Sequence, residues 1–357
     1  MEKLELLKYK VRKYDEEKDK DLPTFSYSKL EVSEKCPMQY NIKYNQKQYA
    51  PQSAIALSLG TLCHKILELK ARMLMERDKE LTEMDYDYLF SVLRSGIEEK
   101  TEKGTEVIPG IEDIKKKFGF EIWYEPDNAS GMNYEEKIDK FIKEVVPSRF
   151  NDTPEWKPFG AEMDFDFVYN YGTEEEPKEI HIHGFIDGVL VDDTENPTKF
   201  MVKDYKTSKK VYPDTQLKTS LQQSIYGLAL YTMYGILPEE YEYDFILINE
   251  RVKANSKGYL NRVCKKLDKL FNSIDEMNNT GKWNPKPTPL CFWCDYCSTN
   301  PDAVEPYKSM CEYFSLWTPQ QKTFSVNKVW SEEDDNELNN DIPANNTSNK
   351  SKRKLIF

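Results

Sequence analysis

The sequence lacks any apolar segment of the roughly 18–20 residues that a membrane-spanning helix needs. Its first fourteen residues alternate charged and apolar side chains, so they do not form the apolar core of a signal peptide. A Gly-x-x-x-x-Gly-Lys-Ser/Thr segment is also missing, which excludes a P-loop motor within this chain. From these absences we expect an intracellular, cytoplasmic protein that does not bind membranes.

Basic residues are fewer than acidic ones: the sequence has 50 Lys and Arg and 62 Asp and Glu, which gives a formal net charge of −12. This total argues against a basic coat for nucleic acid over the whole surface, but it is compatible with a local basic channel. Seven cysteines are present. In a reducing compartment such an odd number is better explained by metal ligands or buried apolar groups than by disulfides.

What is present is enough to build a large core, since the 357 residues include 23 Tyr and 17 Phe. A small disulfide scaffold and a wholly disordered chain are therefore excluded. The polar, Asn-rich composition after residue 330 predicts a disordered acidic tail with a basic and apolar end. We expect an N-terminal segment with the first core helix (1–75), a helical insertion (76–155), a catalytic-type core (156–285), a cysteine-rich region (286–330) and this tail (331–357).

Hydrophobic periodicity predicts the elements of the core. Helical spacing is found over 58–75 and 215–234, and scattered apolar positions predict further helices over 76–150. Alternating patterns predict strands; they run over 161–169, 180–191, 200–206 and 243–248. The resulting order of helix, three strands, helix and strand predicts a mixed α/β core.

Two carboxylates and one ammonium are expected to meet on the predicted sheet. Asp204 and Lys206 are two residues apart, hence on one side of their strand, and Asp187 lies on the preceding strand. Carboxylate oxygens suit a hard divalent ion such as Mg²⁺ or Mn²⁺, which can assist hydrolysis of a phosphodiester. Taken singly, each of these residues is better explained as part of a solvated strand face, and it is the spacing Asp…Asp-x-Lys on paired strands that favours a site.

These residues, with several others, resemble the PD-(D/E)XK nuclease superfamily, and within it the RecB-like exonucleases that carry a four-cysteine iron–sulfur cluster. The matching segments occur in the same order as in that group, between about residues 20 and 315. They are Ser28-Lys-Leu-Glu with Lys35-Cys-Pro-Met-Gln-Tyr40, Gly60-Thr-Leu-Cys-His64, Gly184-Phe-Ile-Asp187, Lys203-Asp-Tyr-Lys-Thr207, Gln222-Gln-Ser-Ile-Tyr226 and Cys291-Phe-Trp-Cys294.

The resemblance implies a restriction-endonuclease-like αβββαβ core and a role for each matching residue. Asp187 and Asp204 would bind the catalytic metal, with His64 as a third ligand and the carbonyl of Tyr205 as a fourth. Lys206 would be the catalytic lysine, and Glu162 the acidic residue of the first core strand, although Asp164 and Asp166 alternate with it. Gln222 and Tyr226 would line the site and contact DNA. On period alone, Tyr226 is equally well explained as a core residue, and an isolated His64 as a buried core histidine.

The cysteines leave two metals open. The local spacing of Cys291, Cys294, Cys297 and Cys311 favours a structural Zn²⁺ knuckle. The resemblance instead implies a [4Fe–4S] cluster, for which we select Cys36, Cys291, Cys294 and Cys311, with Cys297 as the substitute for Cys311. Cys63 and Cys264 have apolar neighbours on helical stretches and are predicted to be buried.

The sequence therefore predicts a metal-dependent deoxyribonuclease, and the resemblance makes it an exonuclease that processes DNA ends in recombination, repair or replication. A non-catalytic DNA-binding or recombination accessory protein with a zinc or iron–sulfur structural site is the alternative. The substrate would be single- or double-stranded DNA ends, and any helicase would be a separate subunit. The final residues Leu355, Ile356 and Phe357 resemble a docking peptide for a replication protein such as a sliding clamp, or form a frayed end. A small acidic chain of this design would suit a phage or other mobile-element nuclease acting in the host cytoplasm.

Overall fold

The protein is described from a computed structural model, which forms two compact units. The first unit comprises Met1–Lys35 and Pro51–Trp283, and the second comprises Cys36–Ala50 and Asn284–Phe357. None of the described helices combines the length and apolar composition needed to cross a lipid bilayer. The structure describes residues 7–51, 55–77, 80–101, 104–213, 220–255, 260–300 and 303–311.

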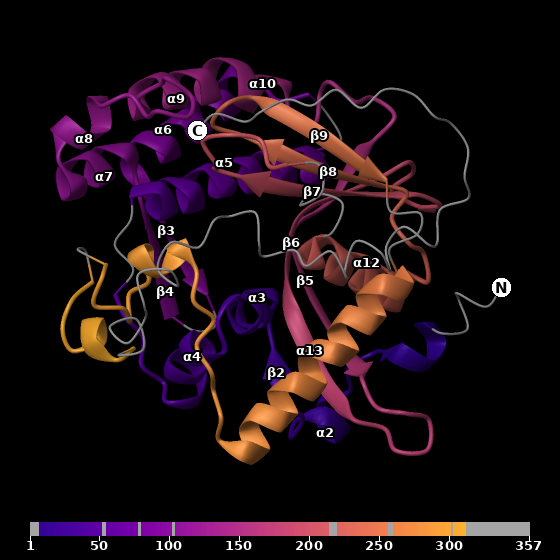
Figure 1. Ribbon diagram of the computed structural model, residues 1–357. Helices are drawn as coiled ribbons and strands as arrows, with labels where there is room; N and C mark the ends of the chain where they lie inside the picture. The colour runs from indigo at the N-terminus through magenta and orange to yellow at the C-terminus, as the bar shows by residue number, and fades with distance from the viewer. Residues whose placement is uncertain are drawn as a thin grey trace, which may run out of the picture. The chain divides into compact units, whose positions relative to one another are not determined.

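A seven-stranded sheet forms the centre of the first unit (Figure 1). Three consecutive long strands pair antiparallel, the next pairs parallel to the third, and the last returns antiparallel. The prediction of a mixed α/β protein with a mixed sheet is thereby confirmed. The strands are β1 (Val11–Arg12), β5 (Lys157–Asn170), β6 (Glu179–Val191), β7 (Phe200–Lys206), β8 (Glu240–Phe245) and β9 (Glu250–Asn255) in sheet order, with β2 (Thr24–Phe25) beside β6.

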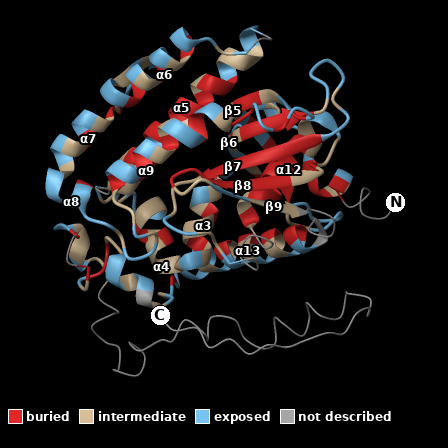
Figure 2. Ribbon diagram, turned by 90° about the horizontal axis from the view of Figure 1, so that it is seen from above, coloured by how far each residue is buried: buried red, intermediate tan, exposed pale blue. Residues whose placement is uncertain are grey.

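Helices α5 (Ile55–Arg77) and α12 (Leu221–Tyr234) cover opposite faces of this sheet. Buried residues of α5 share one apolar cluster with Met201 and Tyr205 of β7. From α12, Gln222 hydrogen-bonds instead to Lys206, the residue after Tyr205, and successive residues of a strand face opposite sides of the sheet. Both faces of β7 are thus covered, and the strand is buried along almost its whole length (Figure 2). Residues 215–219 of the predicted second helix lie outside the described residues.

The insertion over 76–155 was predicted to be helical, but it also contains a β-hairpin. Gly96 ends a helix with φ of +80°, a conformation that favours glycine, and the chain then forms two paired strands. Charged residues between the apolar positions hide the strand period in the sequence. The insertion consists of α6 (Glu83–Ser95), β3 (Gly96–Thr101), β4 (Gly104–Pro109), α7 (Ile111–Phe118), α8 (Phe120–Tyr124), α9 (Tyr134–Lys140), η2 (Phe141–Val145) and α10 (Val146–Ser148).

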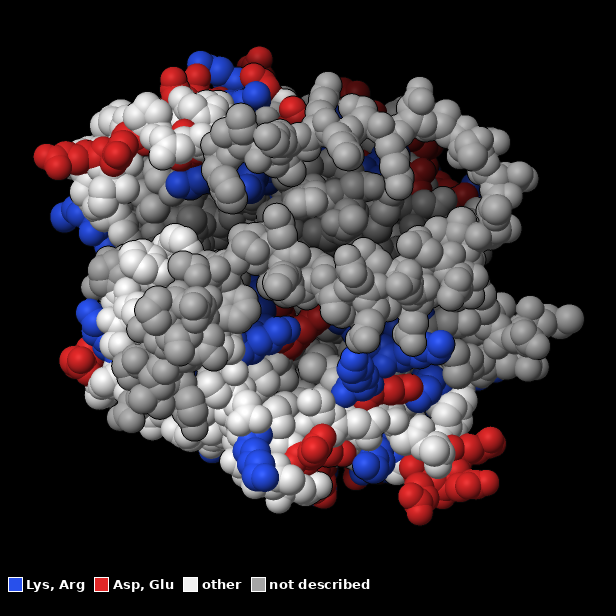
Figure 3. Space-filling model, viewed as in Figure 1, with Lys and Arg blue, Asp and Glu red and all other residues white. Residues whose placement is uncertain are grey.

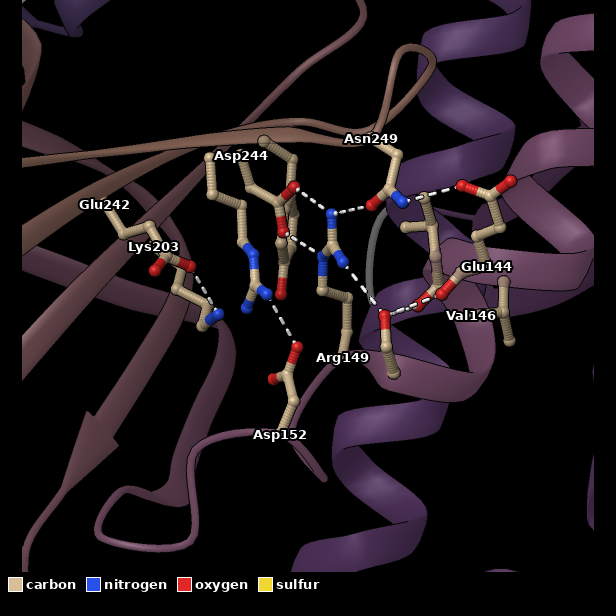
Figure 4. A network of polar contacts seen from close by, with 12 residues as sticks. Glu144, Val146, Arg149, Asp152, Lys203, Glu242, Asp244 and Asn249 are labelled. Atoms are coloured by element: carbon tan, nitrogen blue, oxygen red, sulfur yellow. Dashed lines mark hydrogen bonds and ion pairs between the residues drawn. The ribbon is translucent and has the colours of Figure 1, made fainter.

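Buried ion pairs connect the end of this insertion to the middle of the sheet (Figure 4). Arg149, just after α10, donates to both carboxylate oxygens of Asp244 at 2.6 and 2.8 Å. On the same side of the sheet, Lys203 donates to Glu242 at 2.6 Å. All four side chains are almost completely buried. Because Lys203 precedes Asp204, these pairs help to fix the strand that carries the predicted catalytic residues.

The remaining elements flank the sheet or belong to the second unit. In the second unit, the hydroxyl of Tyr296 donates to the carbonyl of Gln48 at 2.6 Å and joins its two chain segments. The first unit adds α2 (Glu16–Asp19), α3 (Tyr27–Lys35) and α13 (Leu260–Thr280), and the second unit contains α4 (Pro37–Tyr40), η1 (Asn41–Asn45), η3 (Pro289–Trp293) and η4 (Tyr307–Ser309).

Candidate active site

Helix α5 brings His64 to the sheet, and a glycine permits the approach. A Cβ on Gly60 would lie 3.1 Å from the hydroxyl of Thr207, which directly follows β7. A larger residue at position 60 would therefore crowd the Thr207 side chain at the end of that strand. One turn later, the His64 ring packs edge-on against Tyr205, with centroids 5.6 Å apart. The spacing of Gly60 and His64 in the sequence thus has a packing explanation.

His64, Glu162 and Asp187 form a group that could hold a metal ion, and they come from α5, β5 and β6. The Nδ1 atom of His64 lies 3.8 Å from Oδ2 of Asp187 and 4.0 Å from Oε1 of Glu162. Ligand atoms of the three residues all lie within 4.8 Å of one another. Glu162 has φ of +46°, a value that residues with a side chain rarely adopt, so β5 is distorted where its side chain joins the group.

Asp204 and Lys206 lie beside this group on β7. The carboxylate of Asp204 is completely buried, and neither oxygen accepts a hydrogen bond of ordinary geometry, although the Lys206 ammonium is 2.7 Å from Oδ2 as an ion pair. Asp187 accepts a hydrogen bond from the backbone N–H of Tyr205 at 2.8 Å. A buried carboxylate with free lone pairs is costly unless a cation binds it. This donor set therefore fits a hard divalent ion.

Two residues of α12 complete the surroundings of the lysine. The side-chain oxygen of Gln222 accepts from Lys206 Nζ at 2.8 Å, and its nitrogen donates to the hydroxyl of Tyr226 at 2.9 Å. The four-residue spacing on one helix face brings both side chains to the same place. The structure thus gathers all the side chains that the sequence analysis selected for the active site. Tyr205 lies between Asp204 and Lys206, and the role of its carbonyl stays a prediction.

Burial sets the protonation states of the site. It lowers the pKa of His64 to about 4, so the ring is neutral near pH 7 and can offer a lone pair to a metal. It raises the pKa of Asp187 and of Asp204 to about 6 each. Glu162 is raised furthest, to a pKa of about 8, first by burial and then by the charges of Asp187 and Glu68. Without a cation, Glu162 is therefore mostly protonated near pH 7, whereas Asp187 and Asp204 become protonated only as the pH falls through about 6.

The sequence analysis missed an ion-pair cluster next to Glu162. Glu68 is only 6% exposed, and it accepts from Lys65 at 3.0 Å and from Arg72 at 2.6 Å. Lys65 also pairs with Glu99 of the β3–β4 hairpin at 2.5 Å. Glu68 follows His64 by one helical turn, and this four-residue spacing was the one feature of the sequence that placed Glu68 near the site. The cluster fixes the hairpin to α5 beside the metal-binding group.

The predicted cysteine cluster is not formed in the structure. Within the described residues, the one group of three or more histidine, cysteine or acidic ligand atoms close enough to share an ion is that of His64, Glu162 and Asp187. The thiols of the second unit do lie near one another. Burial, followed by the charges of Cys36, Cys291 and Cys297, raises the pKa of Cys294 to about 12.

Cys297 and Cys311 are paired through a backbone bridge, and none of the seven cysteines forms a disulfide. The spacing of cysteines in the sequence limits how near their thiols can come, but the direction of each side chain depends on the local backbone. Close spacing therefore did not suffice to predict a metal cluster. As the predictions stated, Cys63 and Cys264 are buried.

Comparison with known proteins agrees with the geometry of this site. No curated protein matches the sequence. A family model described as the PD-(D/E)XK nuclease superfamily matches residues 24–301, which include all the elements of the sheet from β2 onwards and every residue of the candidate site. The chain therefore belongs to the PD-(D/E)XK nuclease superfamily.

Proposed function

We propose that the protein is a divalent-metal-dependent DNA nuclease, and that it acts as an exonuclease in the processing of DNA ends. One observation carries the proposal: His64, Glu162 and Asp187 converge on one point, next to the buried Asp204 and its partner Lys206. Membership of the superfamily supports nuclease chemistry. The choice of DNA ends rests on the sequence resemblance to RecB-like exonucleases.

In this proposal each side chain has a defined task. His64, Asp187 and Asp204 hold Mg²⁺ or Mn²⁺, with the Tyr205 carbonyl as a further ligand and Glu162 as an acidic neighbour. When bound, the ion supplies positive charge to the scissile phosphate. Lys206 contacts Asp204 and Gln222, and because an ammonium has three donors, one is left for the attacking water or a phosphate oxygen. Gln222, held in turn by Tyr226, fixes the direction of Lys206.

Exonuclease action is tested with DNA that has no ends. With Mn²⁺ or Mg²⁺ present, we expect end-labelled linear DNA to be shortened progressively and covalently closed circles of the same sequence to stay intact. Chelation with EDTA should stop the reaction. Circles cut as fast as linear DNA would contradict the exonuclease assignment while leaving the metal-dependent nuclease. Linear DNA that survives with both metals would contradict the proposed function itself.

Metal affinity is expected to rise by at least about fourfold between pH 6 and pH 8, the change expected when two ligands with a pKa of about 6 lose their protons. At pH 6 the ligands Asp187 and Asp204 are half protonated, so the ion must displace protons from them, and the neighbouring Glu162 is protonated and adds no negative charge. These raised pKa values also mean that the carboxyl groups stabilise the metal-free fold at low pH, and that this contribution disappears as the pH rises towards 8. Titration calorimetry with Mn²⁺ at both pH values measures the effect, and equal affinities would contradict the assignment of these ligands.

The iron–sulfur cluster and the zinc knuckle stay predictions for the second unit. Cys36 shares that unit with Cys291, Cys294, Cys297 and Cys311, which supports a common site, but the described thiols are not gathered as a metal requires. No catalytic step is assigned to such a group. The proposed docking of Leu355, Ile356 and Phe357 on a replication protein falls outside the described residues, as does the rest of the tail.

A further inference from the structure

A row of rings lies along β6 beside the candidate active site. Phe185 is 56% exposed, His183 is exposed, and His181 is half-buried. These are alternate residues of one strand, so their side chains leave the sheet on the same side. The ring of His181 is stacked on Tyr14, with centroids 3.9 Å apart, and lies 5.6 Å from the ring of His183. Single exposed aromatic residues are common, but a row of this kind on one strand is not.

The row leads directly to the metal-binding group. Asp187 occupies the next alternate position after Phe185, and two residues of a strand span about 6.6 Å. The base of a nucleotide whose phosphate is bound at Asp187 could therefore reach the ring of Phe185. This continuity identifies the occupant of the row as the substrate of the active site rather than a separate partner.

The charge next to the row determines which part of that substrate can lie there. Phe185 pairs across the sheet with Asp164, and His183 pairs with Asp166; both acids are exposed. Directly paired residues project to the same side of a sheet. Two exposed carboxylates repel the phosphate backbone, whereas the flat face of a base carries no such charge. On the face shown in Figure 3, side chains of both signs lie next to each other among the described residues.

We propose that Phe185 and His183, with His181 braced by Tyr14, form a stacking surface for unpaired bases of the DNA strand that enters the active site. Bases within a duplex are stacked on one another, so only a single strand or a frayed end can offer their faces. The proposal rests on the proposed nuclease function, and it defines the substrate of that site as unpaired DNA. Stacking on aromatic side chains is tolerant of sequence, so no base preference is expected.

The experiment measures binding without cleavage. Fluorescence anisotropy in EDTA compares a short single-stranded oligodeoxynucleotide with a closed hairpin duplex, for the full-length protein and the variant Phe185→Ala. We expect the variant to bind the single strand about 5- to 100-fold more weakly, the range that loss of one stacked base predicts, and to bind the duplex as before. Phe185→Trp keeps a ring and should bind the single strand at least as tightly as the original protein.

Phe120→Ala is the matched control, because Phe120 is similarly exposed, at 61%, but lies on α8 in the insertion. It should change neither affinity. Unchanged single-strand binding in Phe185→Ala, or an equal loss on both substrates, would overturn the proposal. His183→Ala offers a second test of the same row. Because binding is read without metal, a protein that fails to cleave DNA but loses single-strand binding in Phe185→Ala would contradict the proposed nuclease function and leave the stacking surface intact.

Discussion

Lys206→Met is expected to reduce the single-turnover rate of DNA cleavage by about 10²- to 10⁴-fold, the range typical for loss of one catalytic proton-transfer or charge-stabilising group. Methionine keeps the length of the side chain but removes the charge that contacts Asp204 and Gln222. The positive charge of Lys206 lowers the pKa of Asp204 and also repels a cation, so its removal should not abolish metal binding at pH 8. Rapid-quench assays and Mn²⁺ calorimetry on the same preparation separate the two effects.

Asp204→Asn provides the complementary result, because it keeps the shape of the side chain and removes a ligand charge. Both metal affinity and cleavage should fall in that variant. Lys199→Met is the matched control: Lys199 is exposed and pairs with Glu239 at 3.3 Å on the protein surface, so its loss should leave cleavage unchanged. Undiminished cleavage in both Lys206→Met and Asp204→Asn would show that the active site has been assigned to the wrong residues.

The part of this site that follows strict local periods could be predicted from the sequence. Asp204 and Lys206 share a strand face because they are two residues apart, and Gln222 and Tyr226 share a helix face because they are four apart. The choice of Glu162 over its alternating neighbours could not be derived in this way. It depends on a distortion of β5, where Glu162 has a positive φ that no pattern of apolar residues encodes.

Long-range pairing explains what else the sequence concealed. Arg149 and Asp244 are separated by 95 positions, and each would fit a solvated surface if considered alone. Lys203 would also fit an exposed strand face if considered alone, yet it is completely buried against Glu242. β7 is covered on both faces, so the two-residue period of its side chains does not tell which face can hold a buried charge. Lys203 can be buried because Glu242 of β8 pairs with it, and that pairing is known only from the fold.

Arg149→Met is expected to lower the free energy of unfolding of the first unit by about 3–5 kcal/mol, because it leaves the carboxylate of Asp244 buried without a cation. The guanidinium also donates to Asn249 at 2.8 Å, so the variant breaks several contacts of the network in Figure 4 rather than one pair. Urea denaturation followed by tryptophan fluorescence measures the loss. Since Asp244 lies opposite Tyr205 in the register of β8 with β7, partial loss of cleavage should accompany it.

The size of this effect depends on burial, and a more exposed ion pair between β8 and β9 shows the contrast. Lys253 and Glu240 are 2.8 Å apart but largely in water, so Lys253→Met should cost only about 0–1 kcal/mol. Replacing both buried partners, as in Arg149→Met with Asp244→Leu, removes the unpaired charge and should recover much of the stability lost in the single variant. If Arg149→Met costs no more than Lys253→Met, then water or another cation must reach Asp244, and the buried pair cannot be what holds β8 and β7 against the insertion.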